Sequence, residues 1–349
     1  MKSDQKSLRF GLIGCGGMGA GHALNVKYIP GMEIVAYADV AKDRADHFLK
    51  NLGGEYATDD PDKIIADESI DGVLLVTGEK HHPRLGIAAA RNGKHVFMEK
   101  PVAVTMEEAM KVREVLKNSP VKYQNGMCNR LAPMVKKAKE ALPNPWITFG
   151  QCTDLVSGQA CHNLDLICHL FHQAPLETVY ATGGHNYGFD EHLPADSFTS
   201  ILKFADGTQG TYIQHGKAYN NSLRKYSFQF FGKDRCVYLA NRFMRCIVSS
   251  GLGGDDYEYA FHGREGALKD VGKVEEHEID PQGPRGYMGH YDELVELRDA
   301  IRNDTTPTMT IDHAVNVLAV EKAIFESITS GEIVNYPKFI ERWGFEQPF

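Results

Sequence analysis

The 349-residue sequence lacks the long apolar runs, the excess of positive charge and the paired cysteines that mark several classes of protein. No apolar run approaches the ~20 residues needed to span a bilayer, so we expect no membrane association. The 38 Lys and Arg are outnumbered by 46 Asp and Glu, and the net charge of −8 argues against nucleic acid, which binds clustered cations. The seven scattered cysteines include no Cys-x-x-Cys pair, and residues 1–7 include no signal-peptide core, so we expect a cytoplasmic protein with reduced thiols.

What the chain does contain is an ordinary globular composition, with 42% hydrophobic and 24% charged residues. At roughly 100–200 residues per domain, its length predicts two domains. In the first, residues 1–125, short apolar runs alternate with helical stretches, which is typical of a parallel sheet covered by helices. A capping box at Thr105 predicts the start of the helix Met106–Leu116. The expected strands are Leu8–Ile13, Glu33–Ala38, Gly72–Val76, His95–Met98 and Val121–Gln124.

After Asn125 the pattern changes, and residues 126–349 predict a second domain of mixed helices and alternating strands. Gly207 in an Ala-Asp-Gly turn indicates a hairpin, because glycine accepts the positive φ of such turns. Residues Gly251–Pro284 are expected to form a long loop. The expected helices are Ala132–Ala141, Cys161–Phe171, Tyr291–Arg302 and Ile311–Ser330, and the expected strands are Glu177–Thr182, Phe198–Phe204, Gly210–Gln214 and Ser227–Phe231. The predicted fold class is therefore α/β: an N-terminal Rossmann doubly wound parallel sheet, plus a C-terminal α+β domain with a largely antiparallel open sheet.

A glycine-rich turn directly follows the first expected strand. The run Gly14-Cys15-Gly16-Gly17-Met18-Gly19 matches G-x-G-x-x-G, a pattern that is weak alone but gains weight between a strand and a helix. Gly14 permits the tight turn, Gly16 lets backbone approach a pyrophosphate beside Met18, and Gly19 lets helix and strand pack closely. The helix N-terminus then offers free N–H groups to phosphates.

The next strand ends on Asp39, twenty residues after Gly19, where a carboxylate can accept hydrogen bonds from the adenosine ribose. Its charge would repel a 2′-phosphate, so the pattern favours NAD as cofactor over NADP. Arg44 is the counterargument, because it is near enough in sequence to pair with such a phosphate. FAD and S-adenosylmethionine remain alternatives on the same fold.

The segment His95-Val96-Phe97-Met98-Glu99-Lys100-Pro101 resembles the signature of the glucose–fructose oxidoreductase, inositol dehydrogenase and rhizopine-catabolism (Gfo/Idh/MocA) family. The run Asp71–Thr77 followed by His82 is similar to the family's fourth strand and cofactor loop. Residues Gln159–Asp165 resemble its His-x-x-Asp helix, and Phe204–Thr208 resembles its sheet hairpin. The likeness extends over nearly the whole chain.

This resemblance implies a nicotinamide-dependent oxidoreductase of sugars, cyclitols or their acids, assembled as a homodimer or homotetramer through the C-terminal sheet. It implies that Thr77, His82, Glu99 and Asn125 lie at the cofactor and that His162 acts on the substrate hydroxyl. Lys100 follows a parallel strand, at the edge where such sheets bind ligands, and a buried ammonium near a cationic nicotinamide would have a lowered pKa. We therefore expect Lys100 and His162 to serve as the catalytic pair in proton transfer.

Two departures from the family pattern bear on the substrate. Gly78 stands where the family usually has proline, and Gly158 stands where many polyol dehydrogenases have an aspartate four residues before the histidine. The segment Asp154–Ala160, where many relatives insert a loop, is also short.

Further candidates are assigned to the substrate: Tyr123, Arg130 and Asp165. His162, Asp165 and His169 share one helix face and could instead bind a metal, but the spacing is looser than that of zinc sites, so no metal is expected. The leading hypothesis is a dehydrogenase or ketoreductase of a small-molecule sugar or cyclitol. The alternatives are a redox-assisted NAD-dependent glycosidase or lyase, which regenerates its cofactor, and a non-enzymatic NAD-binding regulator.

Overall fold

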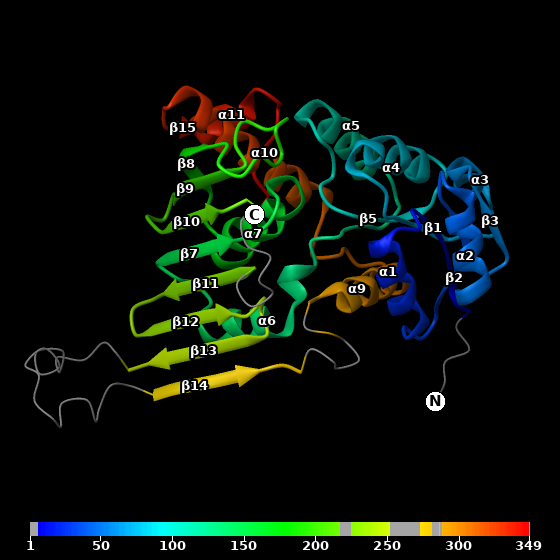
Figure 1. Ribbon diagram of the computed structural model, residues 1–349, viewed down its shortest axis with the longest axis horizontal. Helices are drawn as coiled ribbons and strands as arrows, with labels where there is room; N and C mark the ends of the chain where they lie inside the picture. Colours follow the sequence, from blue (N-terminus) through cyan, green and yellow to red (C-terminus); the bar gives the residue numbers. More distant parts are fainter. Residues whose placement is uncertain (1–5, 217–224, 252–272, 281–285, 287, 349) are drawn as a thin grey trace, which may run out of the picture. The chain divides into compact units, whose positions relative to one another are not determined.

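The computed structural model describes residues 6–216, 225–251, 273–280, 286 and 288–348, which fall into two compact units (Figure 1). The first unit comprises the chain up to Cys128 together with Gly289–Ala319, and the second comprises Asn129–Met288 with Val320–Gln347. A segment close to the C-terminus therefore belongs to the N-terminal unit. Across the described ranges, no helix combines the length and the apolar character that crossing a membrane requires.

The first unit contains a six-stranded sheet in the order β3-β2-β1-β4-β5-β6, and every neighbouring pair is parallel. This order is that of a dinucleotide-binding Rossmann sheet, and it confirms the predicted fold class. The strands are β1 (Leu8–Ile13), β2 (Met32–Ala38), β3 (Tyr56–Thr58), β4 (Gly72–Leu75), β5 (His95–Met98) and β6 (Tyr123–Asn125).

Helices connect these strands, as the right-handed crossovers of a parallel sheet require. They are α1 (Gly17–Lys27), α2 (Lys42–Leu52), α3 (Pro61–Ala66), α4 (His82–Arg91) and α5 (Met106–Lys117). The Thr105 side chain accepts a hydrogen bond from the Glu108 N–H at 3.3 Å, so the predicted cap of α5 is confirmed. Between β4 and α4 lies a short 3-10 turn, Glu79–His81.

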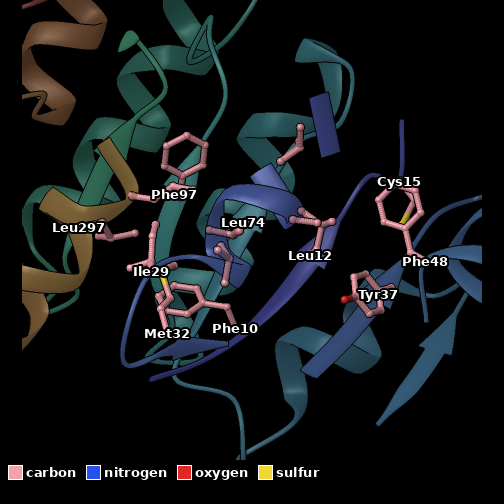
Figure 2. Close-up of a cluster of buried hydrophobic side chains, with 14 of the residues drawn as sticks. Phe10, Leu12, Cys15, Ile29, Met32, Tyr37, Phe48, Leu74, Phe97 and Leu297 are labelled. Carbon is pink, nitrogen blue, oxygen red and sulfur yellow. The ribbon is translucent and has the colours of Figure 1, made fainter. Parts of the chain in front are cut away.

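Helix α9 (His290–Asn303) completes the core of the first unit, although it comes from the end of the chain. Its Leu294 and Leu297 are fully buried in one hydrophobic cluster with Ile29, Met32 and Phe97, as Figure 2 shows for Leu297. A buried leucine is worth roughly 1.5–3 kcal/mol relative to an exposed one, so this contact holds α9 firmly against the Rossmann domain.

The second unit contains a nine-stranded sheet in the order β14-β13-β12-β11-β7-β10-β9-β8-β15, in which only β7 and β10 pair in parallel (Figure 1). The predicted open, largely antiparallel sheet is confirmed. Gly207 has φ of 85° in the hairpin between β9 and β10, as predicted. The strands are β7 (Ile147–Cys152), β8 (Leu176–Gly184), β9 (Ser197–Phe204), β10 (Gln209–Gln214), β11 (Tyr226–Phe231), β12 (Arg235–Ala240), β13 (Arg245–Ser250), β14 (Lys273–Glu278) and β15 (Val334–Asn335).

Two expectations for this unit were wrong. The loop expected at 251–284 contains strand β14, which extends the sheet by pairing with β13; residues 252–272 and 281–285 lie outside the described residues. The helix expected from Cys161 begins at Val156 as α7 (Val156–Asp165) and continues as a π-helical segment, Leu166–Phe171. The other helices are α6 (Pro133–Ala141), α10 (Ile311–Ser330), which runs from the first unit into the second, and α11 (Tyr336–Glu341).

Candidate functional site

The glycine-rich turn joins β1 to α1, and each of its glycines meets a different steric condition. Gly14 has φ of 107°, and a Cβ there would collide with the Val76 carbonyl, so only glycine fits. A Cβ on Gly19 would collide with the carbonyl of Gly14, because helix and turn approach closely. Gly16, by contrast, faces open space in front of the helix. Because the first N–H groups of a helix have no intrahelical acceptor, this opening can receive phosphate oxygens.

A cleft of about 610 Å³ opens beside this turn in the first unit. Asp39 lies in its wall, with one carboxylate oxygen accepting from the Cys15 N–H at 2.8 Å and the other from the Ala41 N–H at 2.9 Å. Arg44 lies in the same wall. The open space at Gly16 fits the phosphates of a dinucleotide, and the carboxylate of Asp39 fits its ribose. Met18, at the helix start, is partly exposed, at 44%.

The loop after β4 contains Thr77 and Gly78, both in the wall of the same cleft. Gly78 has φ of −64°, a value that proline also adopts, so the backbone at this position is compatible with proline. His82 is buried, with Nδ1 2.7 Å from the Pro101 carbonyl oxygen and Nε2 3.0 Å from the Thr77 carbonyl oxygen. Burial lowers the pKa of His82, and the two carbonyls oppose part of that effect. His82 thus joins the loop after β4 to the loop after β5.

Glu99 and Lys100 follow β5, the neighbour of β4 in the sheet. Glu99 is buried, with Oε1 2.8 Å from His22 Nε2 and Oε2 accepting from the Lys100 N–H at 3.2 Å. Burial acts to raise the pKa of Glu99, but His22 and the Lys100 charge outweigh it and lower the pKa to about 2. Glu99 is therefore an ionised carboxylate whose two oxygens are both bound within the protein. The Lys100 side chain is half-buried.

Asn125 and Tyr123 lie in β6, next to β5. The Asn125 amide donates to the Met98 carbonyl at 3.1 Å and to the Tyr123 hydroxyl at 3.0 Å. Among the described residues its Oδ1 has no hydrogen-bond partner although it is buried, which fits a donor such as the carboxamide of a nicotinamide. The sequence predicts that Tyr123 contacts the substrate; in the structure its side chain is buried, and its hydroxyl lies against Asn125 and Met98.

The remaining predicted residues belong to the second unit. His162 lies in α7 and is 5% exposed. Arg130 and Asp165, both assigned to the substrate, form a buried double hydrogen bond with each other; one bond joins Nε to Oδ2 at 2.9 Å, and the other joins Nη2 to Oδ1. His169 Nδ1 lies 3.2 Å from the same carboxylate. Burial acts to raise the pKa of Asp165, but Arg130 and His169 hold it well below its usual range.

The start of α7 depends on a residue that the sequence analysis missed. Asp190 accepts hydrogen bonds from the Val156 N–H at 2.8 Å and from the Ser157 hydroxyl at 2.8 Å, and so caps the helix from 34 residues away. The residue that would cap the helix locally, Leu155, has no side-chain oxygen, which explains why sequence inspection placed the start too late. At Gly158 a Cβ would meet no atom within 4 Å, so this position of α7 faces open space.

His22 and Glu293 are two further buried polar residues that no motif identified. His22 follows the glycine-rich turn by three residues, a position that carries no recognised meaning, and Glu293 comes from the end of the chain. In the described part of the chain, no group of three His, Cys, Asp or Glu side chains is arranged to hold a metal ion.

Comparison with known proteins agrees with this geometry. Residues 8–127 match the oxidoreductase family with an NAD-binding Rossmann fold, and residues 144–336 match the C-terminal alpha/beta domain of the same family. The chain belongs to the Gfo/Idh/MocA oxidoreductase family, as its motifs predicted. Its N-terminal domain is the family's NAD-binding domain, so the predicted cofactor, NAD, is confirmed at the level of the family.

Among curated relatives, the chain is 30% identical over 218 residues to a myo-inositol 2-dehydrogenase of Thermotoga maritima, covering 60% of this chain and 61% of that protein. It is 34% identical over 139 residues to an NAD-dependent scyllo-inositol 2-dehydrogenase of Bacillus subtilis, covering 40% and 41%. It is also 34% identical over 116 residues to a glycosyl hydrolase family 109 protein of Bacteroides thetaiotaomicron, covering 31% and 25%. These matches span less than two thirds of each relative.

A solved levoglucosan dehydrogenase, in complex with NADH and L-sorbose, has the same fold with a TM-score of 0.80. The superposition covers 95% of this chain and 100% of that structure at 20% sequence identity.

Proposed function

We propose that this protein is an NAD(H)-dependent oxidoreductase that acts on a hydroxyl or keto group of a sugar, sugar derivative or cyclitol. The observation that carries the proposal lies within the first unit. Lys100 follows β5 at the carboxyl edge of the parallel sheet, the same edge at which the glycine-rich turn follows β1 and Thr77 follows β4. Ligands of open parallel sheets bind at this edge, so a dinucleotide on the turn extends toward Lys100.

In this proposal Lys100 accepts the hydroxyl proton during oxidation and returns it during reduction. The nicotinamide, when bound, supplies the hydride acceptor or donor. His162 hydrogen-bonds the reacting oxygen, and Thr77, His82 and Asn125 shape the cofactor side of the site. The names of the inositol dehydrogenases among its relatives support a polyhydroxylated ring as substrate.

The test is a screen of inositols and monosaccharides for NAD-dependent formation of NADH, followed by variants at Lys100. We expect Lys100→Met to lower kcat by at least ~10²-fold, the lower range for a positioned acid–base group, while NADH binding persists. Lys111→Met, an exposed lysine on α5, is the matched control and should keep wild-type turnover. Near-normal kcat in Lys100→Met would place the base elsewhere.

A second candidate is a redox-assisted glycosidase or lyase, which one relative's name favours, since it is called a glycosyl hydrolase. Such an enzyme oxidises a hydroxyl, eliminates a substituent and takes the hydride back. Product formation from a glycoside at constant NADH absorbance would select this candidate, whereas accumulation of NADH selects the dehydrogenase.

We also propose that the protein assembles as a homodimer or homotetramer through the nine-stranded sheet. Its exposed face carries apolar side chains on adjacent strands, with Ile147 opposite Phe231 and Tyr180 opposite Ile201. Clustered exposed apolar residues indicate a contact surface. Light scattering coupled to size-exclusion chromatography tests this, and Ile201→Lys should yield monomers.

A further inference from the structure

Behind the Glu99–Lys100 turn lies a buried carboxyl group that the proposed mechanism does not use. Glu293 is on α9, which packs against β5 and β6 within the first unit, and its side chain is fully buried, with 0% exposure. Within the described ranges, neither of its carboxyl oxygens has a hydrogen-bond partner. A buried carboxylate normally binds donors, so the missing partners call for an explanation.

The charged and titratable groups around Glu293 come from three parts of the unit. Glu99 and Lys100 act on it from the end of β5, and Asp292 and Glu296 act on it from α9 itself. The Cys128 thiol, next to the start of the second unit, is in turn influenced by Glu293 and lies 3.3 Å from His290, one turn earlier on α9. Three of these neighbours are carboxylates that disfavour a negative charge on Glu293, whereas Lys100 favours one.

Burial raises the pKa of Glu293 well above its usual range, and the repulsion of Glu99 adds to this effect. Glu99 differs because His22 lies 2.8 Å from one of its oxygens and the Lys100 N–H binds the other. Gly126 packs directly on Glu99, where a Cβ would lie 3.2 Å from the carboxylate carbon, so water is excluded on that side. Glu99 has hydrogen-bond donors and Glu293 has none among the described residues. When two buried acids differ in this way, the acid with donors ionises and the other keeps its proton.

We propose that Glu293 is a positioning residue for Lys100: it stays protonated through the working pH range, so that the buried acid pair Glu99/Glu293 presents a single negative charge to Lys100. This rests on the proposed role of Lys100. One negative charge stabilises the ammonium that forms when Lys100 takes the hydroxyl proton. A second negative charge would raise the pKa of Lys100 further and so oppose its action as a base.

The direct test uses infrared difference spectroscopy on the whole protein, which needs no substrate. We expect the C=O stretching band of a protonated carboxylic acid between about pH 6 and 8, where an ordinary glutamate is ionised. Glu293→Gln should remove the band, Glu293→Asp should shift its frequency, and Asp292→Asn, the matched control one residue away, should leave it unchanged. Absence of the band in the wild type, or its persistence in Glu293→Gln, would overturn the proposal.

The pH–rate profile tests the link to Lys100. One limb of the pH–rate profile should report the deprotonation of Lys100. Glu99→Gln removes the ionised acid of the pair and should move the midpoint of this limb to lower pH by about one unit, since an opposite charge nearby shifts a pKa by ~1–3 units. Glu293→Gln should lower kcat modestly, because the buried carboxyl group is replaced by an amide, but should leave the midpoint of that limb in place. A midpoint moved to lower pH in Glu293→Gln would show that Glu293 is ionised. If the protein turns over no sugar or cyclitol, the proposed function fails, but the infrared result still decides the state of Glu293.

Discussion

The buried ion pair between Arg130 and Asp165 allows the sharpest quantitative prediction. Its side chains are only 9% and 1% exposed, and the two hydrogen bonds use both carboxylate oxygens. The perturbation is Asp165→Asn, which keeps the shape of the side chain and removes its charge. Arg130 cannot shed its proton, because the guanidinium pKa is above 12, so a buried cation loses the anion that balances it.

Removing one partner of a buried ion pair costs about 3–5 kcal/mol of unfolding free energy. We place Asp165→Asn at the upper end, about 5 kcal/mol, because the remaining charge is permanent. Arg130→Met should cost about 3 kcal/mol, since Asp165 keeps His169 3.2 Å away as a partner that can become an imidazolium. The double variant Arg130→Met/Asp165→Leu replaces the pair with apolar groups of similar volume and should be within ~1–2 kcal/mol of wild type.

The assay is urea unfolding of the four proteins near pH 7, in which the free energy of unfolding of each variant is compared with that of the wild type. The pKa of Asp165 is held below its usual range, so the stabilisation is fully present above the unfolded pKa of about 3.9 and is lost only as the pH falls further. The double variant also tests the substrate role first assigned to these residues: a purely structural pair leaves KM unchanged within ~3-fold. A cost below about 1 kcal/mol for Asp165→Asn would refute the reasoning, because that value is typical of an exposed pair.

Three further predictions follow from single residues. Asp39→Ala should reduce the preference for NADH over NADPH, because the variant loses both the hydrogen bonds to the ribose and the repulsion of a 2′-phosphate. Fluorescence titration measures the two dissociation constants. Tighter binding of NADPH than of NADH by the wild type would contradict the role of Asp39. Gly19→Val should abolish NADH binding, since its Cβ meets the Gly14 carbonyl, whereas Gly21→Ala, which faces open space, should bind normally. The pKa of Glu293 is raised in the folded state, so the stability it contributes is present at low pH and is lost as the pH rises, by up to about 1.4 kcal/mol per pH unit above pH ~5. Unfolding curves of Glu293→Gln from pH 6 to 8 should lack this slope; parallel slopes in the two proteins would show that Glu293 is ionised.

Most of the Rossmann half could be predicted from the sequence because its signals are local. The strand Leu8–Ile13, the turn at Gly14 and the cap at Thr105 each depend on residues within one turn or one strand. The hairpin at Gly207 follows the same logic. Where a conformation is determined by its own residues, pattern and structure agree.

The features that escaped prediction depend on residues far apart in the chain. Helix α7 starts where Asp190 caps it, and no pattern near Val156 signals this. Helix α9 joins the Rossmann core through Leu294 and Leu297, although the sequence boundary at residue 125 assigned it to the second domain. The spacing of apolar residues along a helix identifies its apolar face, but it does not show which of the two hydrophobic cores that face packs against.

The same long-range contacts decide which acids can assist His162. Asp165 is the only acidic residue of α7, and both its oxygens are bound to Arg130 and His169. The position one turn before His162 is Gly158, where a Cβ would meet no atom within 4 Å. No carboxylate of α7 is therefore available to share a proton with His162. In the proposed function, proton transfer is therefore assigned to Lys100, which directly follows the buried carboxylate of Glu99 in the first unit.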